Sequence, residues 1–213
     1  MVALAPTHGL EPYYRRELIH RWQEATADQR RRGRRWYSTA RDLLARLAVR
    51  TGYTLEQATA VMAITSPAAQ LVQNIRYTER ALETRGTAKV GRFPSRMVPK
   101  VREVLADPEL AGEYVSGPKV GPFHRAILGA DELVLDRWAI YAAAPMVSDR
   151  DQAHDLTKQA RTAITQAYRT AASAARIRVR DFQAVVWLQT RESTPLLRRG
   201  KYVTVRFADI TAA

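Results

Sequence analysis

The chain has 213 residues, and 34 Lys and Arg against 21 Asp and Glu give it a formal net charge of +13 at pH 7. The absence of cysteine excludes disulfide bonds, cysteine-ligated zinc and thiolate-held iron–sulfur clusters. No apolar run approaches the ~20 residues of a membrane-spanning helix, and no basic head followed by an apolar stretch opens the chain, so we expect an unexported protein with no membrane partner.

A positive charge of this size favours nucleic acid as the partner, because each Lys or Arg that meets a phosphate releases counterions. Two alternatives stay open. The protein could bind ribosome-like or membrane surfaces, or its charge could reflect an arginine-rich composition inherited from a GC-rich genome. The excess of Arg over Lys favours the genomic explanation for part of the charge.

The N-terminal part of the chain predicts a helix followed by a basic run. Tyr14, Leu18 and Trp22 recur every four residues, which is the spacing of one helical face. The arginine-rich run 30–35 comes next, and we interpret it as a solvated loop or helix end, with DNA contact as a second option.

The middle of the chain predicts a series of shorter helices. The helix after the basic run ends at Gly52, and Thr54 with Gln57 has the form of a capping box that begins the next helix. Apolar residues at helical spacing predict further helices over 71–82 and 97–105.

A helix-hairpin-helix is predicted over about 109–128, where two short helices flank a loop rich in glycine and proline. The apolar residues 132–135 then form an extended connection, and Asp136 stands where the next helix begins. Long helices are expected at about 149–175 and 181–191. Apolar and polar residues alternate over 203–207, so a short terminal β-ribbon is one prediction for the tail.

The hairpin and the aspartate after it resemble the helix-hairpin-helix DNA glycosylase superfamily, which includes endonuclease III and the eukaryotic 8-oxoguanine glycosylase. Gly117 matches the second hairpin glycine, Lys119 the lysine of the bifunctional members, and Asp136 the catalytic aspartate. Two positions depart from the pattern. Val115 stands where an earlier hairpin glycine is usual, and Trp138 lies close after the aspartate, where a histidine is common.

Several further segments look like an uncharacterised phage-associated branch of the same superfamily. They are Tyr37–Leu47, Ser66-Pro67 with Asn74 beyond it, Asp136–Ala139 and Gln183–Trp187. The resemblance implies an all-α fold, with residues 1–213 forming a single domain of two helical lobes around a cleft.

The resemblance also implies excision or processing of a damaged or modified base. Cleavage of an N-glycosidic bond builds positive charge on the deoxyribose, which the carboxylate of Asp136 would stabilise while activating water. A neutral amine at Lys119 would attack C1′ and form a Schiff base, followed by strand cleavage. The alternatives are that Asp136 is a plain helix N-cap and that Lys119 only contacts phosphate.

The remaining site residues follow from the same resemblance. The hairpin residues Gly117, Pro118, Val120 and Gly121, with Arg125, would contact a DNA phosphate through the backbone and a cationic side chain. The target base must be flipped out of the duplex, and its candidate pocket contains Asn74, Trp138, Tyr141 and Trp187. The three aromatic residues could instead belong to the core and Asn74 to the surface. Other candidate phosphate contacts are Arg92, Arg96, Lys100 and Arg102.

No metal or cofactor is expected, because the four histidines show no metal-ligand spacing and suit surface or capping roles. We expect a monomer that binds duplex DNA, in the cytoplasm of a bacterial host cell or on its nucleoid. Two other functions stay open on this scaffold: hypermodification of a DNA base in the manner of phage enzymes that act on modified thymines, and non-catalytic DNA binding.

Overall fold

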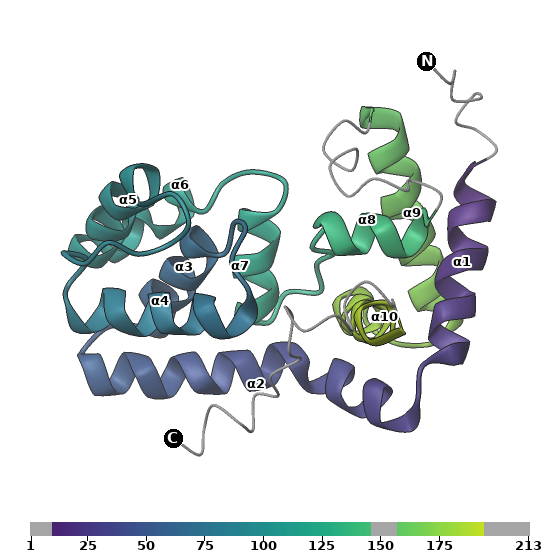
Figure 1. Cartoon of the computed structure of the whole chain (residues 1–213), viewed down its shortest axis with the longest axis horizontal. Helices are drawn as coiled ribbons and strands as arrows, with labels where there is room; N and C mark the ends of the chain where they lie inside the picture. Colours follow the sequence, from purple (N-terminus) through teal and green to yellow (C-terminus); the bar gives the residue numbers. More distant parts are fainter. Residues whose placement is uncertain (1–9, 146–156, 194–213) are drawn as a thin grey trace. The chain divides into compact units, whose positions relative to one another are not determined.

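The computed structural model describes residues 10–145 and 157–193. Within these ranges every regular element is helical, which confirms the all-α prediction (Figure 1). The predicted terminal β-ribbon and the first part of the predicted helix 149–175 lie outside the described residues.

The helices follow one another with short connections. The first five are α1 (Leu10–Glu24), α2 (Ala27–Thr51), α3 (Leu55–Thr65), α4 (Leu71–Glu83) and α5 (Pro94–Ala106). They are followed by the 3₁₀ turn η2 (Pro108–Leu110), α6 (Ala111–Tyr114), α7 (Val120–Leu128), α8 (Arg137–Ala143), α9 (Lys158–Ala174) and α10 (Val179–Ser193).

The described residues divide into two compact units. The first unit contains residues 10–36, 131–145 and 157–193, and the second unit contains residues 37–130. Helix α2 begins in the first unit and ends in the second.

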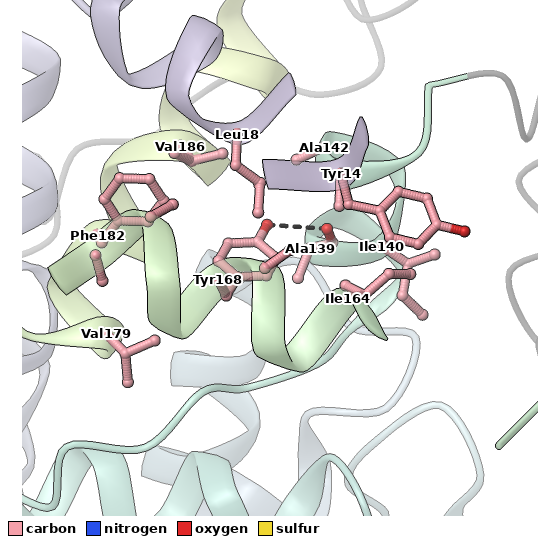
Figure 2. Close-up of a cluster of buried hydrophobic side chains, with 14 of the residues drawn as sticks. Tyr14, Leu18, Ala139, Ile140, Ala142, Ile164, Tyr168, Val179, Phe182 and Val186 are labelled. Carbon is pink, nitrogen blue, oxygen red and sulfur yellow. Dashed lines mark hydrogen bonds between the residues drawn. The ribbon is translucent and has the colours of Figure 1, made fainter. Parts of the chain in front are cut away.

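The core of the first unit is formed by α1, α8, α9 and α10 (Figure 2). Tyr168 and Phe182 are fully buried there, and the ring of Trp22 stacks on Phe182 with 5.1 Å between the centroids. Burial of each such large side chain contributes about 1.5–3 kcal/mol to folding. The Tyr168 hydroxyl donates a hydrogen bond of 2.9 Å to the carbonyl of Ala139, so the one polar atom of this ring is satisfied.

The core of the second unit surrounds α3, whose residues from Gln57 to Thr65 are all buried. Helices α4, α5 and α7 pack against it. The predicted capping box is confirmed: the Thr54 hydroxyl accepts from the Gln57 N–H at 3.1 Å, and Oε1 of Gln57 accepts from the Thr54 N–H at 3.0 Å. Nε2 of Gln57 also donates to the carbonyls of Val104 and Leu105 at the end of α5.

The prediction that the basic run 30–35 is a loop or helix end is wrong, because α2 passes through it without a break. Arg32 pairs with Asp28 one turn earlier and with Glu192 of α10, at 2.6 and 2.8 Å. Arg30 donates to the last carbonyls of α1 at Trp22 and Gln23. Since arginine is a good helix former and these partners compensate its charge, the run continues the helix.

Candidate nucleic-acid site

The hairpin has the predicted form, with α6 and α7 on either side of a turn. Gly117 has a φ of +98°, a backbone conformation that is cheap only for glycine. Gly121 is buried, and a Cβ there would lie 2.8 Å from the Val115 carbonyl oxygen. Helix α7 begins at Val120, and Pro122 lies in its first turn, where proline is tolerated. Both hairpin glycines are therefore required by the backbone.

Lys119 is the N-cap residue of α7 and is partly exposed. Its Nζ donates to the carbonyl of Ser66 at 3.4 Å, at the C-terminal end of α3. The side chain thus ties the hairpin to α3. Pro118 and Arg125 are exposed beside it and accessible to a partner.

Asp136 is the N-cap of α8, as one of its two interpretations predicted. Its Oδ1 accepts a hydrogen bond of 2.8 Å from the N–H of Ala139, and the backbone at residue 136 is extended. The connection before it is held by the buried side chain of Gln183, which donates to the Val134 carbonyl at 3.1 Å and accepts from the Val134 N–H at 3.4 Å. These bonds fix the point at which the aspartate enters the helix.

Three of the four residues predicted for a base pocket come together in the first unit. The rings of Trp138 and Tyr141 on α8 lie edge to face at 6.2 Å. The guanidinium of Arg191 lies 5.5 Å from the centroid of Trp138 and 4.5 Å from that of Trp187. We call these residues, with Trp36, the aromatic cluster.

Sequence reasoning missed two members of the aromatic cluster. Arg191 follows Trp187 by four residues on α10, so helical spacing could have placed them on one face. Trp36 meets Trp187 edge to face at 6.2 Å from α2, and no local pattern indicates this contact. All the members are partly buried, so they are neither core residues nor free surface residues.

Asn74 lies apart from the aromatic cluster in sequence and belongs to the second unit. The expectation of a surface position is wrong, because the side chain is buried. Its amide donates to the Met62 carbonyl at 3.0 Å, and its oxygen accepts from the Thr65 hydroxyl at 2.7 Å. Both bonds satisfy the last turn of α3, so the side chain already has a structural role within its own unit.

His124 also differs from its prediction. It was expected on the surface or in a cap, and it is buried in α7. Burial lowers the pKa of its imidazole, an effect that Arg125 reinforces and Glu56 opposes.

In residues 10–145 and 157–193 we find no helix with the length and apolar character needed to cross a bilayer. Comparison with known protein families matches residues 6–194 to a family described as a family of unknown function (DUF7178). No curated protein and no solved structure matches the chain. Because the match covers most of the sequence, the chain belongs to this family of unknown function.

Proposed function

We propose that this protein is a DNA glycosylase-like enzyme that cleaves the N-glycosidic bond of a damaged or modified base. The observation that supports it best is the composition of α8. A carboxylate at its N-cap, Asp136, is followed on the same short helix by Trp138 and Tyr141 of the aromatic cluster. One helix thus carries both a group that stabilises positive charge and rings on which a base stacks.

The capping bond of Asp136 is compatible with catalysis. An ionised carboxylate can accept several hydrogen bonds at once, so the bond from the Ala139 N–H does not by itself prevent a second role. A carboxylate placed near C1′ stabilises the oxocarbenium-like sugar as the base departs and orients water for attack. The cap itself limits rotation of the side chain, which lowers the cost of positioning it.

The aromatic cluster supplies the surface for a flipped base. Extrusion costs a few kcal/mol, and stacking on an indole recovers about 1–3 kcal/mol. The Arg191 guanidinium lies against the rings of Trp138 and Trp187, so it adds N–H hydrogen-bond donors and a positive charge at that surface.

The hairpin supplies the contact with the DNA backbone. The turn before α7 is exposed over residues 116–118, Gly117 has no side chain to cover its backbone, and nothing lies within 4 Å of the position that a Cβ would take there. Arg125 is exposed one turn into α7. A phosphate at this turn would meet backbone amides and a cation, which together position DNA without reading its sequence.

The test is Asp136→Asn, because asparagine is also a good N-cap and only the charge is removed. The assay uses duplexes that each carry one uracil, hypoxanthine, 8-oxoguanine, 3-methyladenine or 5-hydroxymethyluracil, with mass spectrometry of the released base and of the remaining DNA. We expect release of at least one base by the wild type, and a fall of about 100-fold or more in Asp136→Asn at unchanged DNA affinity.

Two other results would replace the proposal. A base that is altered in mass but still attached to the sugar indicates hypermodification. No reaction on any duplex, with DNA affinity retained in both proteins, indicates a binding module. In a binding module the hydrogen bonds of Asp136 to the Ala139 N–H and of Lys119 to the Ser66 carbonyl would have a structural role alone.

A further inference from the structure

A cavity of about 260 Å³ lies within the second unit, beside the hairpin, and all of its lining residues belong to that unit. Its volume is close to the lower end of the range for small-ligand pockets. Its apolar lining comes from the end of α3, the loop after it, the first turn of α5 and the start of α7, and consists of Ile64, Pro67, Met97 and Val120. The cavity therefore suits a flat apolar group of moderate size.

The rim of this cavity carries an aromatic ring and two cations. Phe93, directly before α5, is 48% exposed, an unusual exposure for so large an apolar side chain. Arg96 and Lys100 are exposed and lie four residues apart on α5, so they share one face of the helix. Neither forms an ion pair with any other residue in the described parts of the chain. The positive charge at the rim is thus uncompensated.

The other wall of the cavity belongs to the hairpin. Ser116, which begins the turn, lines the cavity together with Tyr114 of α6. A hydrogen bond to Glu103 raises the pKa of the Tyr114 phenol to about 12, so the hydroxyl stays protonated and the ring stays tethered to α5. Lys119 of the hairpin donates a hydrogen bond to the carbonyl of Ser66, and Ser66 directly precedes Pro67 of the lining. The turn that would hold a phosphate and the cavity are built from the same segments.

We propose that this cavity takes one unpaired nucleotide of a DNA strand. The base would lie on Phe93 and the apolar lining, and its phosphate would meet Arg96 and Lys100. An apolar hollow with an aromatic edge suits a π-face, and two unpaired cations on one helical face suit an anion attached to it. The proposal rests on DNA as the partner in the proposed function, and it does not depend on the reaction at Asp136.

The experiment measures binding of the full chain to a short fluorescent oligothymidine and to an oligonucleotide of equal length that carries tetrahydrofuran abasic sites. The variants are Phe93→Ala and the pair Arg96→Ala/Lys100→Ala. A matched pair, Arg46→Ala/Lys89→Ala, removes the same charge from exposed residues that do not line the cavity. Thermal melts check that each variant folds, which we expect because all five positions are exposed.

We expect Phe93→Ala to weaken binding of oligothymidine about ten-fold and to leave binding of the abasic strand unchanged, because only the former offers a base to stack. We expect the cavity pair to weaken both strands more than the matched pair does. Equal effects of Phe93→Ala on the two strands, or equal effects of the two charge pairs, would overturn the proposal.

A last arm distinguishes the source of the nucleotide. Thymidine monophosphate is titrated alone against the wild type and Phe93→Ala. Phe93-dependent binding of the free nucleotide, with oligothymidine unaffected by the variant, would show a metabolite site and overturn the assignment to a strand. The binding experiments are independent of the base-release assay. Phe93→Ala tests the nucleotide site in this cavity, and Asp136→Asn tests the reaction, so one proposal can fail while the other holds.

Discussion

Gly33 of α2 lies directly against Val185 of α10. A Cβ on residue 33 would stand 2.4 Å from Cγ2 of Val185 and 2.6 Å from its Cα. Both atoms are closer than any real Cβ contact, and one of them is backbone. The glycine inside the arginine run therefore sets how closely α2 and α10 approach.

Gly33→Ala should destabilise the protein by about 2–3 kcal/mol, because the helices must move apart to admit the methyl group. This expected loss of stability is opposite to the effect of helix propensity, which favours alanine over glycine inside a helix. Gly112→Ala is the matched control, since nothing lies within 4 Å of its Cβ position in α6. It should stabilise the protein by up to about 1 kcal/mol. Urea unfolding measures both, and equal effects would refute the packing argument.

Gln57→Ala should cost about 2–3 kcal/mol. The variant loses half of the capping box and the two bonds to the carbonyls of Val104 and Leu105, and it leaves a buried gap. Thr54→Ala removes only the cap contact from an exposed residue and should cost about 1 kcal/mol. The same urea series checks this, and a Gln57 effect no larger than that of Thr54 would contradict it.

His124 should make the protein less stable in mild acid. Burial lowers its pKa, so below pH ~6.5 the unfolded chain binds a proton that the folded chain rejects. The contribution of the neutral imidazole to folding stability is then fully present above that pH, and it is lost as pH decreases through the pKa of His124 in the folded protein. Thermal midpoints at pH 7.5 and 5.5 should differ more for the wild type than for His124→Gln. His20→Gln is the control at an exposed histidine, and its thermal midpoints at the two pH values should differ by as much as those of the wild type.

Tyr168 should make the folding stability fall as pH rises in the alkaline range, the opposite direction to the effect of His124. Burial raises its pKa well above 10, so the unfolded chain loses the phenolic proton first. Its contribution is intact below pH ~10 and is lost as pH rises toward the folded pKa. Tyr168→Phe should cost about 1 kcal/mol at pH 7 through the lost bond to Ala139 and should flatten the decline above pH 10. An unchanged decline in this variant would contradict the assignment.

Borohydride trapping on a duplex with one abasic site tests the lyase step. We expect the wild type to form a covalent complex that Lys119→Ala does not form, because the Schiff base requires that amine. Lys89→Ala is the control for incidental reaction of an exposed lysine and should still form the complex. No Lys119-dependent complex would remove the lyase step and leave the role proposed for Asp136 untouched.

Local signals predicted the elements of this fold well, and contacts between distant segments were beyond them. Thr54 with Gln57 and the cap at Asp136 depend on residues within one helical turn, so the sequence was sufficient for both. In the arginine run, by contrast, one carboxylate that compensates Arg32 comes from Glu192, which lies 160 positions away.

In the candidate site too, contacts within one helix could be predicted from the sequence and contacts between distant segments could not. Trp138 and Tyr141 share one helix and were grouped from the sequence, whereas Trp36 reaches Trp187 across the chain and was missed. Asn74 was misplaced because its partners, the Met62 carbonyl and the Thr65 hydroxyl, belong to a different helix, α3. Whether a polar residue is exposed or bonded inside the fold depends on neighbours that helical spacing does not reveal.

The second unit is inserted into the first, and this has a consequence for synthesis on the ribosome. The described residues of this unit, 37–130, emerge as one continuous segment, so they can fold while the rest of the chain is being made. The first unit needs α1 together with α8, α9 and α10, so its N-terminal helix must wait until α10 has been translated. During that interval Tyr14 and Leu18 of α1 lack their native partners on α8, α9 and α10, so this apolar face stays exposed to other partners until the chain is nearly complete.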